Sequence, residues 1–374
     1  MLRFCLGFLS LLLGAAALAE APQPPAVAAR AWLLLDATSN QPIAGHNSGE
    51  RIEPASLTKM MTAYLVFSAL RDGSLAPGQP VRVSERAWRA AGSRMFIVQG
   101  SSVTVADLLR GMIVQSGNDA CIALAEAVAG SEDAFVQRMN REAQRQGMQD
   151  TRFANSSGLP DPGHYSTASD LALLTTSLIR DFPEHYKLYA EREYRYNNIT
   201  QQNRNRLLWL DPNVDGVKTG HTESAGYCLI ASSRRAERRL VSVVIGAPSD
   251  RLRAQDSQKL LNFGFQSYDG VRLYGKGDEI SKLRVWKGST RELKAGVAKD
   301  LFVTVPKGTA DLLRADLISQ QPLVAPVAAG QRVATLRVSH EGRPVGEYPV
   351  VALENVAVAG IFRRAWDGIA LWFR

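Results

Sequence analysis

Apolar and polar positions follow two different periodicities along the chain, one typical of strands and one typical of helices. Residues 31–36 and 42–46 are short apolar runs around the polar turn 38–41, a pattern that predicts a β-hairpin. Beyond residue 56 the apolar positions recur with helical spacing and are punctuated by capping and glycine signals. We expect helices over about 56–70, 104–115, 118–130, 131–147 and 169–180, and a Ser-, Gly- and Pro-rich loop over 155–169.

The pattern changes to strands near residue 214. Apolar runs at 227–233 and 240–247 flank the polar turn Arg234–Arg239 and predict a second hairpin, which is followed by a helix over 253–265. From 271 to 352 short alternating runs are separated by glycine and proline. These runs predict a small all-β domain.

The two ends of the chain have a character of their own. One arginine, Arg3, precedes an apolar stretch that ends in Ala17-Leu-Ala19, the pattern of a secretory signal peptide over residues 1–19. An uncleaved N-terminal anchor is the alternative, although the stretch is short for a membrane span. Residues 20–29 are rich in alanine and proline and indicate a linker, so we expect an exported protein.

The last segment, residues 356–374, contains an amphipathic helix. Its apolar arc consists of Ile361, Phe362, Ala365, Trp366, Ile369, Trp372 and Phe373. Its polar arc carries Arg363, Arg364, Asp367 and Arg374, with Leu371 misplaced among them. Aromatic residues opposite arginines are typical of a helix that lies in a membrane interface, here an anionic membrane surface. A helix docked on the protein's own core is the alternative.

Composition narrows the function further. The 374 residues carry a net charge of +8, but the basic residues are dispersed and form no run of five or six. This dispersal and the expected export both make nucleic-acid partners improbable. Two of the three cysteines, Cys121 and Cys228, remain after signal cleavage, and both lie in apolar runs typical of buried thiols. Scattered histidines without metal-ligand spacing predict no metal and no cofactor.

Three short motifs carry the candidate chemistry, and the first is Ser56-Leu-Thr-Lys59 at a helix start. Residues three apart on a helix share a face, so the serine hydroxyl and the lysine amine are neighbours. A serine needs a base to act as a nucleophile, and burial among Met60, Met61 and Leu65 favours the neutral amine. A capping serine beside a solvated lysine is the alternative for this motif alone.

The second motif, Ser116-Gly-Asn118, interrupts two helices, and the third, Lys218-Thr219-Gly220, follows a strand. The amide of Asn118 can both donate to and accept from a substrate amide, although Asn118 or Asp119 could equally cap the following helix. Gly220 lets a substrate backbone approach the strand, Lys218 adds positive charge, and Thr219 offers a hydroxyl to a carboxylate. An ordinary strand end is the alternative for the third motif.

In this order the three motifs resemble those of the D-alanyl-D-alanine carboxypeptidases, the low-molecular-mass penicillin-binding proteins of the type 5 and 6 group. Longer stretches are similar too: Pro54–Met61, Gln115–Cys121 and Asn213–Thr222. The resemblance implies an α+β fold. It comprises a catalytic domain over 30–270 with an antiparallel sheet between helices, a β-rich stalk over 271–355, and attachment to the periplasmic face of the inner membrane.

The resemblance also implies the reaction. Ser56 attacks the bond between the two D-alanines that end a peptidoglycan stem peptide, Lys59 accepts its proton, and water later releases the acyl group. Ser116 and Lys218 pass a proton to the leaving amine, Asn118 holds the acyl side, and the Ser56 and His221 backbone forms the oxyanion hole. Arg204 and Arg253 are implied near the substrate carboxylate. Penicillin and other β-lactams are expected to acylate Ser56.

Three rival functions share parts of this pattern. A class A β-lactamase needs a deacylating glutamate, and the only matching spelling, Glu193-Tyr-Arg-Tyr-Asn197, lies close before Lys218 in a Tyr- and Arg-rich segment that we interpret as chance. A D,D-endopeptidase is disfavoured by the appended β domain. A wall-binding protein with an inactive site is disfavoured by the intact motifs.

Overall fold

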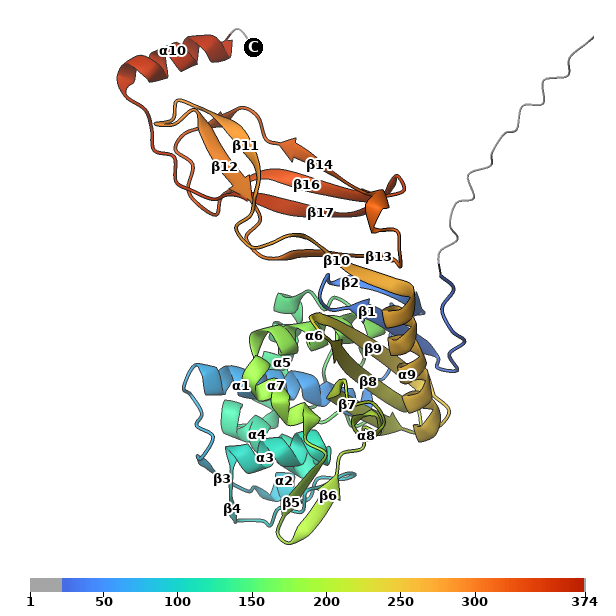
Figure 1. Cartoon of the computed structure of the whole chain (residues 1–374). Helices are drawn as coiled ribbons and strands as arrows, with labels where there is room; N and C mark the ends of the chain where they lie inside the picture. Colours follow the sequence, from blue (N-terminus) through green and yellow to red (C-terminus); the bar gives the residue numbers. More distant parts are fainter. Residues whose placement is uncertain (1–21, 373–374) are drawn as a thin grey trace, which may run out of the picture.

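A five-stranded antiparallel sheet forms the centre of the first domain, in the order β2-β1-β9-β8-β7 (Figure 1). The computed structural model of the chain describes residues 22–372, so the expected signal peptide lies outside the described residues. The strands are β1 (Ala31–Asp36), β2 (Gln41–His46), β7 (Val214–Thr222), β8 (Gly226–Arg235) and β9 (Arg238–Ala247). Both predicted hairpins are therefore present, and β7 is an edge strand.

The sheet separates two hydrophobic cores, and the alternation along β1 shows how. Ala31 and Leu33 belong to the core shared with the helices that follow, whereas Trp32 and Leu34 belong to the core beneath α9 (Asp250–Ser267). Side chains of a strand point alternately to the two faces, so a buried strand with apolar residues at every position needs cover on both. Helix α6 (Ala168–Asp181) packs on the face opposite α9.

The remaining helices of this domain lie beside the sheet, most of them around α1 and α4, whereas α8 lies beside β7 (Figure 1). They are η1 (Ala55–Thr58), α1 (Lys59–Arg71), α2 (Glu85–Trp88), α3 (Val105–Val114), α4 (Asn118–Ala129), α5 (Glu132–Gln146), α7 (Pro183–Tyr186), η2 (Lys187–Ala190) and α8 (Leu207–Leu210). The long helices match the predicted ranges, because Thr104 and Ser131 cap α3 and α5 and Gly130 ends α4 in the left-handed conformation. The single-turn helices were not predicted.

One capping prediction was wrong. The N-cap of α4 is Gly117, whereas Asn118 and Asp119 lie within its first turn. The Asp119 carboxylate instead accepts hydrogen bonds from the backbone N–H groups of Met95 and Phe96, at 2.9 Å each, and of Ile97. Asp119 Oδ1 also accepts from the Ala120 backbone N–H at 2.9 Å, so this carboxylate joins the first turn of α4 to the loop that precedes α3.

Two small antiparallel strand pairs were also missed by the sequence reading. The first pairs β3 (Pro80–Arg82) with β4 (Ser102–Thr104), which lies beyond α2, and the second is a hairpin of β5 (Glu193–Tyr196) and β6 (Ile199–Gln202). The turn of the β5–β6 hairpin consists of Asn197 and Asn198, both with the positive φ that a two-residue turn matching strand twist requires.

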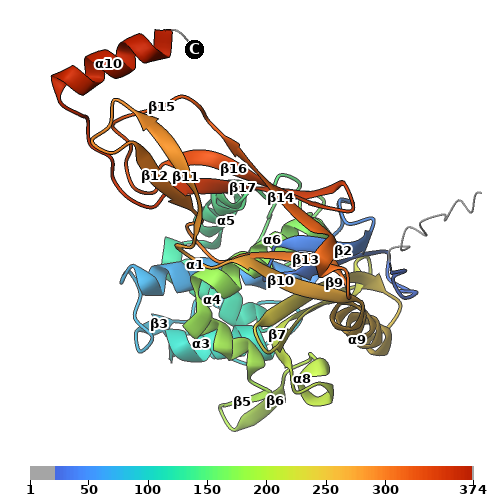
Figure 2. The ribbon, with the colours of Figure 1, turned by 45° about the horizontal axis from the view of Figure 1, so that its top comes forward.

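The second domain is built of strands (Figure 2). A six-stranded sheet has the order β14-β16-β17-β12-β11-β15, and β10 pairs with β13. The elements are β10 (Tyr268–Tyr274), β11 (Glu279–Trp286), β12 (Glu292–Gly296), β13 (Leu301–Pro306), η3 (Ala310–Leu312), β14 (Leu313–Ser319), β15 (Leu323–Val324), β16 (Arg332–His340) and β17 (Arg343–Ala352). Its own hydrophobic core is separate from the two cores of the first domain.

A buried polar network joins the two domains. Asp36, which is 0% exposed, accepts hydrogen bonds from Arg238 Nε at 2.7 Å and from Thr304 Oγ1 of β13 at 2.9 Å. Gln41 accepts from the Thr304 backbone N–H at 2.6 Å. A buried carboxylate is costly unless it is paired, so this network favours one relative position of the domains.

Helix α10 (Ile361–Trp372) lies at the end of the β domain that is remote from α8 and the β5–β6 hairpin (Figure 1). Asp367 accepts a hydrogen bond from the Lys287 backbone N–H at 2.6 Å, and Arg363 donates to the Ser289 carbonyl at 3.1 Å. The half-buried Leu371 lies one helical turn beyond Asp367 and so shares this docked side. Leu371, the apolar residue on the predicted polar arc, thus lies on the side of the helix that faces the β domain.

Candidate active site

A cleft of about 820 Å³ lies where the edge strand β7 passes the start of α1. Its wall includes residues from all three motifs, together with the loop after Asn155 and the segment around α8. The lining residues include Ser56, Ser116, Asn118, Thr219, Gly220, His221, Arg204 and Arg253. The structure therefore brings the sequence-predicted residues together from segments up to about two hundred positions apart.

Ser56 lies in the 3₁₀ turn η1, one turn before the first residue of α1, Lys59. Lys59 Nζ is 3.0 Å from Ser56 Oγ, as the shared helical face predicts. Lys59 is only 1% exposed, and burial is the main cause that lowers its pKa to about 8, since desolvation disfavours the charged amine. The positive charge of Arg204 lowers this pKa further, while Asp119 opposes the shift.

The surroundings of Lys59 also orient its amine. Nζ lies 2.7 Å from Asn118 Oδ1 and 2.6 Å from the Ser157 carbonyl oxygen, and both of these are acceptors. A neutral amine has two N–H groups and one lone pair. When both N–H groups donate to Asn118 and Ser157, the lone pair is left to face Ser56 Oγ, which is the geometry a base requires.

Ser116 and Asn118 sit at the junction of α3 and α4. Ser116 adopts the left-handed conformation with φ +67°, which is uncommon for a residue with a side chain. Its Oγ is buried and has no hydrogen-bond partner within residues 22–372. Asn118 Nδ2 donates to the Ala91 carbonyl at 2.6 Å, so its amide is held in one orientation.

The third motif lies on β7. Lys218 is 3% exposed, and burial together with the nearby charges of Lys59, Arg204 and Arg253 holds its pKa well below the usual range. A side chain at Gly220 would place a Cβ 3.3 Å from the Ser56 backbone nitrogen, so the strand passes close to η1. The ring of His221 is exposed and packs on Tyr227, with centroids 4.1 Å apart.

The two arginines differ in their freedom. Arg204 is exposed in the cleft, and its guanidinium makes one hydrogen bond, to Ser93 Oγ at 3.0 Å. Arg253 is buried, with Nη1 donating to the carbonyls of Gly220 and Cys228 and Nη2 paired with Asp250. Arg204 is thus available to a ligand, whereas Arg253 ties α9 to the ends of β7 and β8.

Several residues around the site were missed by sequence reasoning. The Ser157 carbonyl that contacts Lys59 belongs to the predicted loop, and no sequence signal marks a backbone acceptor. His164 Nδ1 accepts from the Ala154 backbone N–H, so Nε2 carries the proton and donates to Thr58 Oγ1 at 2.9 Å. Burial lowers the pKa of His164 to about 4, which keeps the ring neutral.

Other chemistries find no support among the described residues. Glu193 is exposed on β5 and does not line the cleft. No group of histidine, cysteine and acidic residues there has the arrangement of a metal site. Cys121 and Cys228 are buried free thiols.

Comparison with known protein families gives two matches. The D-alanyl-D-alanine carboxypeptidase family matches residues 18–249, and the family of the penicillin-binding protein 5 C-terminal domain matches residues 268–358. D-alanyl-D-alanine carboxypeptidase DacC of Escherichia coli K12 is 42% identical over 359 residues, which cover 94% of this chain and 90% of the relative. D-alanyl-D-alanine carboxypeptidase DacF of Bacillus subtilis is 35% identical over 338 residues, which cover 89% of this chain and 87% of the relative.

Solved structures show the same likeness. Penicillin-binding protein 5 from Haemophilus influenzae has a TM-score of 0.86 at 40% identity and covers 90% of this chain and 99% of that one. Penicillin-binding protein D2 from Listeria monocytogenes, in its ampicillin-bound form, has a TM-score of 0.60 at 30% identity. The match covers 65% of this chain and 100% of that one.

Proposed function

The chain belongs to the D-alanyl-D-alanine carboxypeptidase family, and on that premise we propose how its own residues divide the work. It is a serine-type carboxypeptidase that removes the terminal D-alanine from peptidoglycan stem pentapeptides through an acyl-enzyme, and it binds penicillin covalently. The contact of Lys59 Nζ with Ser56 Oγ, at 3.0 Å inside the cleft, carries the assignment of roles.

Acylation begins when Ser56 Oγ attacks the carbonyl carbon of the penultimate D-alanine. Its proton passes to the lone pair of Lys59, and negative charge develops on the carbonyl oxygen. The backbone N–H groups of Ser56 and His221 stabilise this oxyanion, which is supported by the close passage of β7 at Gly220. Collapse of the intermediate breaks the peptide bond and leaves the acyl group on Ser56.

The leaving D-alanine needs a proton on its amine. Ser116 Oγ, buried without a partner among residues 22–372, is free to relay a proton in a group with Lys218. Asn118 binds the acyl side of the substrate. Water then attacks the carbonyl carbon of the acyl-enzyme and the ester bond to Ser56 Oγ breaks. One water proton returns to Ser56 Oγ, and the shortened peptide leaves with the water oxygen in its new carboxyl group.

Substrate recognition divides between two arginines. Arg204, exposed in the cleft and hydrogen-bonded to Ser93 Oγ at 3.0 Å, pairs with the terminal carboxylate alongside Thr219. Arg253 adds charge and holds the strand end at Gly220, because its N–H groups are already engaged by the protein. The cleft thus selects a free carboxylate over an amidated peptide end.

The chemistry is tested by substitution of Ser56. Ser56→Ala should abolish both D-alanine release from a pentapeptide ending in D-Ala-D-Ala and the penicillin adduct seen by mass spectrometry. Ser68→Ala, a half-buried serine on α1 outside the cleft lining, is the matched control and should retain both. A persisting adduct in Ser56→Ala would assign the nucleophile elsewhere, whereas the absence of both activities from the unsubstituted protein would reopen the rival of a wall-binding protein with an inactive site.

We also propose that the protein is exported and that α10 attaches it to the periplasmic face of the anionic inner membrane. Within residues 22–372 no helix has the length and apolarity to cross a bilayer. The apolar side of α10 is exposed by 59% or more at Ile361, Phe362, Trp366, Ile369 and Trp372, while its other side is docked on the β domain. Such an arrangement suits a helix that lies in the headgroup region.

The membrane proposal is tested by truncation after Ala359. Val356 and Val358 form β-bridges with Val327 and Gly288, so the cut must leave them in place. The shortened protein should stay unbound in a liposome pelleting assay with anionic vesicles and should keep full turnover on a small peptide. Pelleting of the shortened protein would point to the N-terminal segment as the anchor.

Single substitutions separate the two forces at α10. Trp366→Glu should weaken liposome binding more than Arg364→Ala, since one exposed arginine near an anionic surface contributes only about 1 kcal/mol. The opposite order would mean that charge, and not the apolar face, holds the helix.

A further inference from the structure

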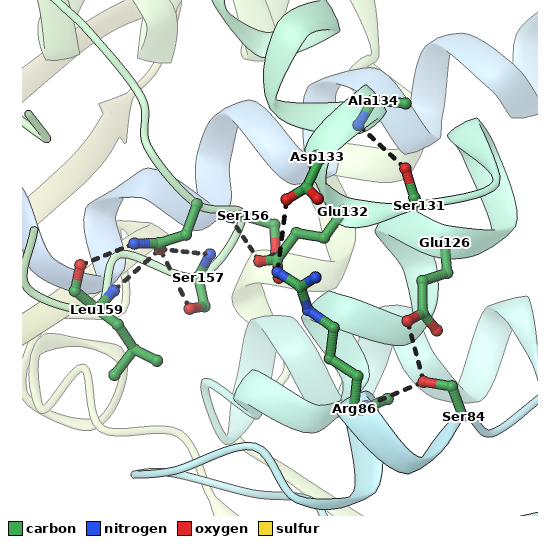
Figure 3. A network of polar contacts seen from close by, with 12 residues as sticks. Ser84, Arg86, Glu126, Ser131, Glu132, Asp133, Ala134, Ser156, Ser157 and Leu159 are labelled. Carbon is green, nitrogen blue, oxygen red and sulfur yellow. Dashed lines mark hydrogen bonds and ion pairs between the residues drawn. The ribbon is translucent and has the colours of Figure 1, made fainter.

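A buried carboxylate lies behind the segment that contacts Lys59 (Figure 3). Glu132 is the first residue of α5 and is only 4% exposed. Its Oε1 accepts two hydrogen bonds from Ser156, from the backbone N–H at 3.0 Å and from Oγ at 2.6 Å. Its Oε2 pairs with Arg86 of α2 at 2.7 Å.

Ser156 precedes the residue whose carbonyl meets the catalytic amine. Its own carbonyl accepts from Thr62 Oγ1 of α1 at 2.6 Å, and the next carbonyl, that of Ser157, accepts from Lys59 Nζ at 2.6 Å. The amide side of the Ser156 residue is therefore held by Glu132 while the carbonyls beyond it face α1. Residues 153–164 form a loop without regular structure, so the position of the Ser156 amide depends on side-chain hydrogen bonds such as those to Glu132.

We propose that Glu132 is a positioning residue for the base. It fixes Ser156 so that the Ser157 carbonyl stays at the place where it consumes one N–H of Lys59 and leaves the lone pair facing Ser56. This inference rests on the proposed role of Lys59 as the base. Glu132 touches neither substrate nor reacting atoms, and it acts only through Ser156 and Ser157.

Two neighbouring residues, Asn155 and Asp133, allow the positioning role of Glu132 to be tested separately from loop folding and from negative charge. Asn155 Oδ1 accepts from the backbone N–H groups of Ser157, Gly158 and Leu159, so the loop has a second restraint and should survive the loss of Glu132. Asp133 also contacts Arg86, at 3.6 Å, yet it is exposed and makes no hydrogen bond to Ser156 that the structure shows. Asp133 is thus the matched control carboxylate on the same helix turn.

The test measures acylation by a fluorescent penicillin in stopped flow, which separates the first-order acylation rate from the affinity of the initial complex. Glu132→Ala should lower the acylation rate at least about tenfold, because small misplacements of reacting groups cost up to about a hundredfold. The affinity of the initial complex should stay within about twofold, since Asn118, Arg204 and Thr219 are untouched. Asp133→Ala should resemble the unsubstituted protein.

A second pair of variants keeps the test decisive if Glu132→Ala folds poorly. Glu132→Gln retains an oxygen acceptor for Ser156 and should keep most of the acylation rate, while Ser156→Ala removes one of the two hydrogen bonds and should lower it. Equal losses in Glu132→Ala and Asp133→Ala, or a loss confined to initial affinity, would overturn the positioning role. An active Lys59→Arg variant would instead overturn the proposed base itself, so the two failures are distinguishable.

Discussion

The acylation rate should rise with pH, because the proposed base works only when it is neutral. Burial beneath the Ser157 loop lowers the pKa of Lys59 from its ordinary 10.5 to about 8. Protonated Lys59 has no lone pair to accept the Ser56 proton, so the rate at a fixed penicillin concentration should follow the neutral fraction of this one amine.

The size of the effect follows from that pKa. With a pKa of about 8, roughly a tenth of the molecules hold neutral Lys59 at pH 7 and about nine tenths at pH 9. The acylation rate should therefore increase about tenfold across these two pH units and then level off. An unshifted lysine would leave the neutral fraction at pH 7 about three-hundredfold smaller.

The assay is fluorescent-penicillin acylation at constant ionic strength over pH 6 to 10, with protein stability checked at each pH. Arg204→Gln provides an internal test, since the Arg204 charge lowers the Lys59 pKa. Its removal should shift the rise of the acylation rate to higher pH. Arg89→Gln, which removes an exposed arginine on the surface, should leave the pH dependence of the acylation rate unchanged. A rate that is flat from pH 6 to 9 would refute a titrating Lys59 as the base.

Three further predictions concern the loop, the acyl-enzyme and the domain interface. Gly158→Ala should destabilise the protein by about 1–3 kcal/mol in thermal melts, because φ is +85° and a Cβ would lie 1.8 Å from the Ala55 carbonyl oxygen; an unchanged melting temperature would contradict this close approach. The penicillin adduct should persist in time-resolved mass spectrometry, since the described cleft lining includes no glutamate for deacylation; rapid release of hydrolysed penicillin would favour the β-lactamase rival. Thr304→Val should make the junction between the domains, where α9 passes into β10, more accessible to proteases, because it removes one donor to buried Asp36; unchanged digestion would show that the Arg238 bond to Asp36 and the Gln41 bond to the residue 304 backbone N–H are sufficient.

The sequence predicts the long elements of this fold because local signals specify them. The Thr104 cap, the Gly130 terminus and the two long hairpins are each encoded within a few neighbouring residues. The short α7 and α8 carry too few residues for a periodic pattern. The β5–β6 hairpin was missed although asparagine tolerates the positive φ that both turn residues, Asn197 and Asn198, adopt.

The site divides in a similar way. The proximity of Ser56 and Lys59 follows from helical spacing, so the sequence alone predicts it. The meeting of Lys59 with Asn118 and the Ser157 carbonyl depends on how α4 and an irregular loop pack against α1, which no local pattern encodes. The engagement of Arg253 by strand carbonyls is likewise a tertiary property, and it separates two arginines that look equivalent in sequence.

The buried Asp36 network has a consequence for the proposed attachment at a membrane. It sets the angle between the cleft-bearing domain and the β domain, and α10 lies at the opposite end of the molecule from α8 (Figure 1). If α10 lies in a bilayer, as we propose, the length of the β domain sets the height of the cleft above the lipid surface. Lengthening the β domain would then move the cleft to stem peptides that lie farther from the membrane.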